Sequence, residues 1–319
     1  SRGLGDVYKR QGMQTVVRDF DSKKIPAVYT VANWNGDAQA AQRWLDVAEQ
    51  GRYDLILSMG SESTAFLHDH DTAGRVPVVT VVSKDPVLLG QMRDYTHGSG
   101  TSIAYTSVSV PIDLQMAYLL QMKPGLKNVG VMYEQSNTSA VDTQVTPFRK
   151  AAAARNIQTI DVVVVDTKSA PQELEMKVPE AVRRMQVSDP QEQNSIFLVT
   201  GSTSVFTAIA TINKVAGNVP VVSMFPELVQ PGDDSAALSI GVSFETSAHL
   251  SAQFAADILQ GRAKASDLPV GVVTPPDIAV NFLKAKEIGL KVPFGFFESS
   301  SLVYDTSGKL VRAAGQAVP

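Results

Sequence analysis

The sequence contains no cysteine among its 319 residues. This excludes a disulfide scaffold, a thiol nucleophile and a cysteine metal site, and it is compatible with an oxidising compartment. No apolar run approaches the roughly 18 residues that a membrane-spanning helix needs. Basic blocks are missing too, and the net charge is −4. Binding to nucleic acid or to an anionic membrane is therefore not indicated.

Catalytic and cofactor motifs are also missing. There is no G-x-x-x-x-G-K-[ST] phosphate loop and no G-x-S-x-G nucleophile elbow. Gly98-Ser99-Gly100 lacks the third glycine of a dinucleotide fingerprint. His68-Asp69-His70-Asp71 could suggest a metal, but residues two apart on a helix do not share a face, so a solvated helix end is the preferred interpretation. We expect no catalytic residue, no metal and no cofactor.

What the sequence does contain is a repeated unit of strand, polar loop and helix. Val129–Tyr133 is a short apolar run with β-branched residues and predicts a buried strand. A polar loop follows at 134–139, and apolar residues then recur at spacings of three and four from Val141. In open parallel sheets, ligands lie at the carboxyl ends of such strands, against helix N-termini.

The same alternation runs through most of the chain and predicts an α/β fold of parallel sheets covered by helices on both faces. The length permits two domains, and the two halves share one rhythm. Further strands are expected at 27–31, 54–59, 76–82, 160–165, 196–199, 219–224, 237–242 and 278–281.

The first eleven residues differ from the rest, because Ser1 to Gln11 shows neither a strand nor a helix period. We interpret this stretch as a foreign or mis-joined leader that replaces a native start. It should form no central strand and should leave the first sheet one strand short. Good burial of Val7 and Tyr8 in that sheet would contradict this interpretation.

Polar residues gather in five loops, each at the carboxyl end of an expected strand. These loops are 60–64, 83–85, 134–139, 200–204 and 225–227. Free backbone N–H groups at the helix starts suit a carboxylate. For any single loop, the alternative is that Ser, Thr, Asn and Asp merely cap the helix.

Three stretches together resemble the ABC-transporter substrate-binding proteins of the tryptophan- and tyrosine-binding type. The first is Ser83-Lys84-Asp85-Pro86-Val87, and the second is Lys127–Tyr133 with the loop 136–139. The third is the pattern from Asn281 to Pro293. The resemblance implies two Rossmann-like lobes of the type I periplasmic-binding-protein kind, joined by a hinge of several crossovers. It implies an N-terminal lobe of 1–105 plus 244–273 and a C-terminal lobe of 106–243 plus 274–319, with crossovers near Tyr105, Ser243 and Thr274.

The resemblance also implies a function and partners. The expected protein is a monomer that captures a small carboxylate-bearing organic solute, such as an amino acid, aromatic ones included, in a cleft between its lobes. It would deliver the solute to a membrane ABC permease. Its expected location is periplasmic, or extracytoplasmic with a lipid anchor.

The candidate ligand-binding residues divide by role. Ser61, Ser63 and Thr64 are expected to bind the carboxylate. Glu134 or Asp85 would pair with an amino group. Neutral donors and acceptors would come from Asn137, Ser139, Ser202 and Thr203. An apolar group of the solute would be flanked by Tyr105, Phe225 or Trp34. The remaining candidates from these loops are Ser83 and Glu227.

Two other functions compete with this interpretation. One is a hydrolase or transferase that uses Glu134 or Asp85 as a base in the same cleft. The other is the sensor domain of a transcriptional regulator, which a helix-turn-helix before Gly12 would favour.

Overall fold

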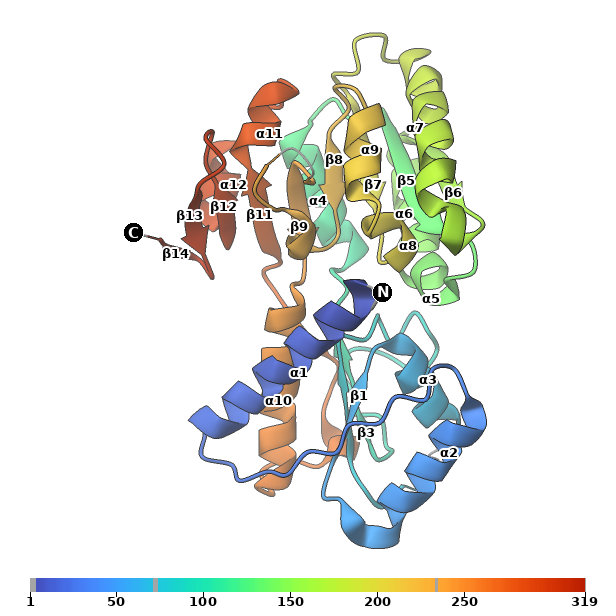
Figure 1. Ribbon diagram of the computed structural model, residues 1–319, viewed down its shortest axis with the longest axis vertical. Coiled ribbons are helices and arrows are strands. Elements are labelled where there is room, and N and C mark those ends of the chain that lie inside the picture. Colours follow the sequence, from blue (N-terminus) through green and yellow to red (C-terminus); the bar gives the residue numbers. More distant parts are fainter. Residues whose placement is uncertain (1–3, 71–73, 233–234, 319) are drawn as a thin grey trace. The chain divides into compact units, whose positions relative to one another are not determined.

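The computed structural model of the protein describes residues 4–70, 74–232 and 235–318, and side chains from residue 10 onward. The chain divides into two compact units. Unit 1 consists of Ser1–Val108 and Phe244–Val273, and unit 2 consists of Ser109–Ser243 and Thr274–Pro319. Each unit is thus assembled from two separate segments of the chain (Figure 1).

Unit 1 has a parallel sheet in the order β1-β2-β3, and a second pair in which β10 runs parallel to β4. Asp37 caps α2, since its carboxylate accepts from the backbone N–H groups of Gln39 and Ala40. The elements are α1 (Leu4–Ser22), α2 (Ala38–Val47), η1 (Ala48–Arg52), β1 (Ile56–Met59), α3 (Ser61–His70), β2 (Val78–Val81), β3 (Ile103–Ala104), β4 (Thr106–Ser107), α10 (Phe244–Leu259), η5 (Ala265–Asp267) and β10 (Gly271–Val272).

Helices cover both faces of the unit 1 sheet. On one face, Val79 and Val81 of β2 pack in a cluster with α1 and with the alanines of α10. On the other face, Val78 packs in a cluster that contains Leu45 of α2 and Leu67 of α3. Successive residues of β2 therefore enter opposite layers, as the period of a strand requires.

Two predictions for unit 1 were wrong in detail. Residues 27–31 form no strand: they lie in a stretch without regular secondary structure, and Val28 and Val31 are 97% and 64% exposed. The stretch 60–64 is not a loop, because α3 begins at Ser61. Residues 4–11 form no strand, as expected, although they belong to helix α1, where the sequence showed no helix period; the side chains of Val7 and Tyr8 lie outside those described.

Unit 2 contains one nine-stranded sheet in the order β14-β13-β12-β11-β9-β8-β7-β5-β6. The strands from β9 to β6 are parallel to their neighbours, as predicted. One strand beside this parallel part runs the other way, since β11 pairs antiparallel with β9. Beyond β11, the segment after residue 300 adds three short strands that the sequence did not predict.

The strands of unit 2 are β5 (Asn128–Glu134), β6 (Gln158–Val164), β7 (Ser195–Val199), β8 (Val221–Ser223), β9 (Leu238–Gly241), β11 (Asp277–Asn281), β12 (Leu302–Tyr304), β13 (Leu310–Ala313) and β14 (Gln316–Ala317). Its helices are α4 (Ile112–Met122), α5 (Thr138–Ala140), η2 (Val141–Val145), α6 (Thr146–Ala153), η3 (Thr167–Ser169), α7 (Ala170–Gln186), α8 (Thr203–Phe206), α9 (Ile209–Val215), η4 (Pro226–Leu228), α11 (Phe282–Glu287) and α12 (Phe294–Ser299).

Candidate functional site

In unit 2, the loops after β5 and β7 meet at the carboxyl edge of the sheet. The Oγ of Ser202 accepts a hydrogen bond from the backbone N–H of Glu134 at 3.0 Å. Two residues earlier, Thr200 Oγ1 donates to the carbonyl of Met132 at 2.8 Å. These hydroxyls continue the hydrogen bonding of the sheet beyond the ends of the two strands, so the loops are held at the edge where parallel sheets place ligands.

Asn137 joins the same two loops through its amide. Its Oδ1 accepts from the backbone N–H of Ala140 at 3.1 Å and from Ser139 Oγ at 3.0 Å, which makes it the N-cap of α5. Its Nδ2 donates to the carbonyl of Gly201 at 3.2 Å. The structure thus brings Glu134, Asn137, Ser139 and Ser202 together, as the sequence predicted. It also shows that Asn137 and Ser139 serve the cap.

The carboxylate of Glu134 is held only by neutral donors. Ser136 Oγ donates to one oxygen, and Ser204 Oγ donates to the other at 2.8 Å. The side chain is half-buried, and among the described residues no Lys, Arg or His forms an ion pair with it. A partly desolvated carboxylate without a cationic partner favours a cationic ligand group.

The other candidates in unit 2 have different surroundings. Thr203 is exposed at the start of α8. Phe225 is buried, with its ring centroid 6.2 Å from that of Phe206. Glu227 is half-buried on η4. The burial of Phe225 places it among the packing residues of this edge.

Sequence reasoning missed one residue that supports this edge. Gln144 is buried, and its Oε1 accepts from the backbone N–H of Gly201 at 2.6 Å. It lies on η2, within the helical stretch after the β5 loop, and no motif marks it. Thr200 and Ser204, in contrast, lie inside the loop 200–204 that the sequence singled out, although neither was named as a ligand.

In unit 1, the serines predicted to bind a carboxylate hold α3 against the sheet. Ser61 Oγ accepts from the backbone N–H of Lys84 at 2.9 Å, which ties α3 to the loop after β2. Ser63 Oγ lies 2.9 Å from the carbonyl of Met59 and 2.9 Å from Ser58 Oγ. Thr64 is fully buried, with its Oγ1 3.1 Å from Ser58 Oγ. These contacts match the alternative role, that of fixing a helix start.

The exit of β2 is different. Val82 has φ of +53°, an unusual conformation for a β-branched residue. The next residue, Ser83, is buried, and its hydroxyl has no hydrogen-bond partner within the described parts of the chain. Unusual backbone conformations persist only where the surrounding structure holds them in place, and they are found most often at functional sites. An unpaired buried hydroxyl beside one is a candidate ligand contact.

Asp85 is fully engaged within unit 1. Its Oδ1 accepts from the backbone N–H groups of Val87 and Leu88 at 2.9 Å and 3.1 Å, and its Oδ2 accepts from the hydroxyl of Tyr95 at 2.7 Å. Burial raises the pKa of Tyr95, and the hydrogen bond to Asp85 and the charge of Asp85 raise it further. Of the two carboxylates considered for binding an amino group, Glu134 accepts fewer hydrogen bonds from the protein than Asp85 does.

The aromatic candidates of unit 1 pack against α3. The ring centroids of Trp34 and Phe66 are 5.5 Å apart. Tyr105 is buried, with its hydroxyl 2.9 Å from Nδ1 of His68. His70 Nδ1 lies 2.8 Å from the carbonyl of Phe66, so the two histidines have separate partners. The fourth member of that motif, Asp71, lies outside the described residues, among which no group could hold a metal ion.

Residues 5–297 match a protein family described as ABC transporter substrate binding protein. The chain belongs to this family. The match covers most of both units, and it confirms the resemblance drawn from the sequence. No curated protein matched the chain.

Several solved structures share the fold. A domain from Streptococcus pneumoniae in complex with L-Trp has a TM-score of 0.70 at 16% identity, covering 93% of this chain and 96% of that one. A substrate-binding protein with adhesive properties from Clostridium difficile has a TM-score of 0.66 at 19% identity, covering 93% and 95%. A conserved domain protein from Vibrio cholerae scores 0.71 at 15% identity, covering 93% and 95%. The fold is therefore that of type I periplasmic binding proteins, as predicted.

Family membership settles the general activity. Members of this family bind small solutes and work with the membrane permease of an ABC transporter, and they are binding proteins rather than enzymes. Membership also implies a periplasmic or other extracytoplasmic location. No helix in the described parts of the chain is long and apolar enough to cross a membrane.

Proposed function

We propose that this substrate-binding protein captures an amino acid or a related solute that carries both a carboxylate and an amino group. The observation that carries the proposal is Glu134. Its half-buried carboxylate lies at the carboxyl edge of the unit 2 sheet with hydroxyl donors but, among the described residues, no ion pair. An ammonium group would supply the missing charge, and a hydrogen bond to a charged group contributes about 1.5–3 kcal/mol.

The proposal assigns the solute's carboxylate to unit 1. The Ser83 hydroxyl is buried and has no hydrogen-bond partner in the part of the chain that the structure describes, and Ser83 follows Val82 with its positive φ. Nearby, the loop after β2 is bonded to Ser61 at the start of the ten-residue helix α3. The unpaired N–H groups of a helix N-terminus favour an anion.

Three further features belong to the proposal. The solute class includes aromatic amino acids, which the complex of the pneumococcal relative with L-Trp makes reasonable for this chain. The protein acts as a monomer. A lipid anchor holds it outside the cytoplasm, close to the permease.

The test is calorimetry on the protein and on Glu134→Gln, after a thermal-shift screen with aromatic and branched amino acids and with the matching acids that lack the amino group. The amide keeps the shape of the side chain and removes its charge. We expect Glu134→Gln to weaken amino-acid binding roughly ten- to a hundredfold. Binding of an acid without the amino group should change little.

The matched control is Glu180→Gln, an exposed carboxylate on α7, which should bind like the parent. Equal affinity of Glu134→Gln and the parent for the amino acid would contradict the role of Glu134. A Ser83→Ala variant that binds like the parent would contradict the role given to unit 1.

A further inference from the structure

Strand β6 forms one end of the nine-stranded sheet of unit 2. Among the described strands it pairs only with β5, and α7 lies beside it (Figure 1). With seven residues, β6 is a much longer edge than β14 at the other end, which has two. A long edge strand presents unpaired N–H and C=O groups, which can pair with a strand of another molecule. The surroundings of β6 therefore decide whether this edge is open to a partner.

The hydrogen bonds of β6 show which of its backbone groups face outward. The N–H of Gln158 donates to the carbonyl of Lys127 at 2.8 Å, and the carbonyl of Val164 accepts from the N–H of Gln135 at 2.9 Å. Residues of even number therefore face β5, because the backbone groups of successive residues point to opposite sides of a strand. The residues whose backbone groups face away from β5 are Thr159, Asp161, Val163 and Val165.

Two charged side chains of α7 bind groups on this outward side. Lys177 Nζ donates to the carbonyl of Val163 at 2.6 Å. The carboxylate of Glu173 accepts from the N–H groups of Val165 and Asp166 at 3.1 Å and 2.8 Å. Fixing the start of α7 would account for Glu173 alone, but the partner of Lys177 lies within the strand. Together the two side chains occupy backbone groups that a further strand would need.

Glu173 and Lys177 also hold each other in place. They form an ion pair one helical turn apart on α7. The Glu173 side chain is 13% exposed, and that of Lys177 is 35% exposed. The hydrogen bonds from Lys177 and from the N–H of Asp166 lower the pKa of Glu173 to about 2. The carboxylate is therefore ionised near neutral pH, and both charges remain at the edge.

The middle of β6 is complementary to itself. Within the described chain, no hydrogen bond occupies the backbone N–H or C=O of Thr159 or Asp161. In an antiparallel pair of two β6 strands with a two-fold axis at Asp161, Thr159 of each copy would lie opposite Val163 of the other. The N–H of Thr159 would then need the carbonyl of Val163, which is the group that Lys177 binds.

We propose that Glu173 and Lys177 keep the β6 edge closed to a second copy of this chain, and that the edge becomes a dimer interface when the pair is removed. A second strand laid along β6 would take the place of the Lys177 ammonium on Val163. It would also bury the two charges away from water, which is costly. A second copy is the expected occupant of the opened edge, because the free groups of β6 match their own two-fold arrangement.

The test is sedimentation velocity on the unaltered protein and on the double variant Glu173→Gln/Lys177→Met, at several concentrations. The unaltered protein should sediment as a monomer throughout, and the double variant should form dimers whose fraction rises with concentration. The matched control is Glu175→Gln/Lys214→Met. It removes a second ion pair of α7, with an N–O distance of 3.9 Å, and the same charges, but neither residue binds β6. This control should remain monomeric.

A third variant shows whether the dimers form through β6. Thr159→Pro, added to the double variant, removes an outward N–H and no hydrogen bond to β5, so it should abolish the dimers. Dimers that survive this change, dimers of the unaltered protein, or a folded double variant that stays monomeric would each overturn the proposal.

Amide exchange on the unaltered protein tests the proposal without any variant, in case the double variant does not fold. The N–H of Val165, bonded to Glu173, should exchange roughly tenfold or more slowly than the N–H of Asp161. Equal exchange at the two positions would mean that the pair does not occupy the edge, and would overturn the proposal. No ligand enters these measurements, so their outcome is independent of the proposed function.

Discussion

The hydroxyl of Tyr95 donates a hydrogen bond to Oδ2 of Asp85 at 2.7 Å, and the other oxygen of the same carboxylate caps the turn at Val87 and Leu88. One side chain therefore fixes both the start and the end of the loop that leaves β2. Asp85 belongs to the stretch that first suggested the family, and its role in the structure is to shape this loop.

Tyr95→Phe should destabilise unit 1 by about 1 kcal/mol, because it removes one hydrogen bond to a carboxylate. The value lies at the low end for a charged acceptor, since Tyr95 is 43% exposed. Urea unfolding followed by fluorescence measures the change. Tyr53→Phe is the control, because no described hydrogen bond involves the Tyr53 hydroxyl. Equal midpoints for the two variants would show that the Tyr95 bond contributes nothing.

Tyr95 should also ionise at higher pH than an ordinary tyrosine. Burial raises its pKa above the usual value of about 10, and Asp85 adds to the effect. The stability linked to this group is complete below the unfolded pKa and is lost as the pH rises through the folded pKa. Ultraviolet difference spectroscopy of the phenolate follows this titration. Asp85→Asn should move the Tyr95 pKa part of the way back, and no movement would mean that burial alone sets it.

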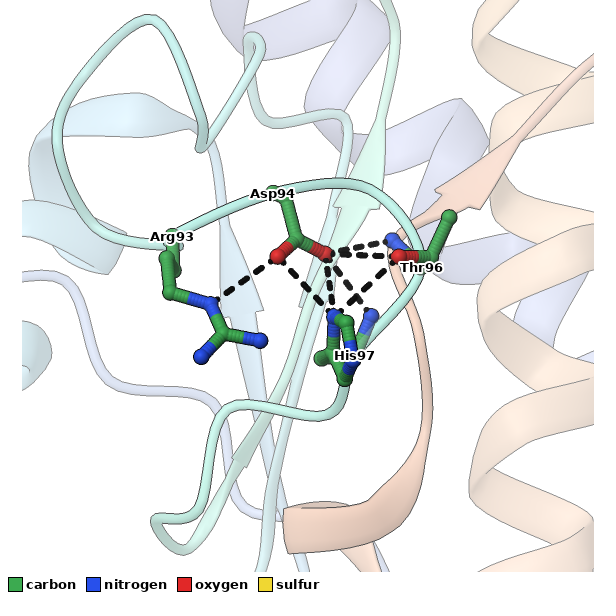
Figure 2. A network of polar contacts seen from close by, with 4 residues as sticks. All are labelled: Arg93, Asp94, Thr96 and His97. Carbon is green, nitrogen blue, oxygen red and sulfur yellow. Dashed lines mark hydrogen bonds and ion pairs between the residues drawn. The ribbon is translucent and has the colours of Figure 1, made fainter.

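An exposed loop of unit 1 holds a carboxylate with an unusually low pKa (Figure 2). Asp94 accepts from Arg93 Nε, from the backbone and hydroxyl of Thr96, and from the backbone and ring of His97, all at 2.9 Å. The ring of His97 is the largest cause of the lowered pKa, followed by the backbone of Thr96.

A lowered pKa means that this contribution to stability is present above the unfolded value of about 3.9 and is lost as the pH falls through the folded value. In an NMR titration, the Asp94 carboxyl should therefore remain ionised at pH values at which an ordinary aspartate, with a pKa of about 3.9, is already protonated. His97→Ala should raise the Asp94 pKa. If Asp94 titrates like an ordinary aspartate in the unaltered protein, the network does not persist in solution.

Replacing Gln144 should weaken the carboxyl edge of unit 2. The change Gln144→Ala leaves the N–H of Gly201 without its acceptor in a buried place, which costs about 1–3 kcal/mol in the free energy of unfolding. Urea denaturation gives the value. Gln135→Ala, an exposed position in the β5 loop, is the control and should stay within about 0.5 kcal/mol of the parent. A Gln144 variant as stable as this control would contradict the role of the bond.

The strands that could be predicted from the sequence are the buried ones. Those of β5 and β7 stand out because both faces of a parallel sheet are covered, so apolar residues follow one another without polar interruption. The strands β12 to β14 were missed because they are two to four residues long and partly buried or, in β14, exposed, which leaves no such run. For the segment 27–31 the error was the opposite one, a predicted strand that does not form. Strand-like composition is not sufficient, because a strand also needs a neighbouring strand to pair with.

The candidate site divides along similar lines. Loop residues such as Glu134 and Ser202 could be placed at one edge, because parallel strands bring their carboxyl ends together. Gln144 could not, because its role depends on a helix turning its side chain toward a loop far away in sequence. Nor does sequence reveal that the Ser83 hydroxyl has no hydrogen-bond partner among the described residues while the Asp85 carboxylate has three, since this depends on how the backbone turns after Val82.

The division of unit 1 into two segments has a consequence during biosynthesis. Ser251 on α10 donates its hydroxyl to the carbonyl of Thr80 on β2, across 171 positions of sequence. At about 5–20 residues per second, the ribosome needs roughly ten to thirty seconds after making Thr80 before it makes Ser251. During that time Val79 and Val81 lack the alanines of α10 that cover them. A nascent chain released after Ser243 should therefore be cleaved by protease within residues 10–108, whereas one released after Val273 should resist. Such a delay keeps the first unit open until the second of its two segments has been made.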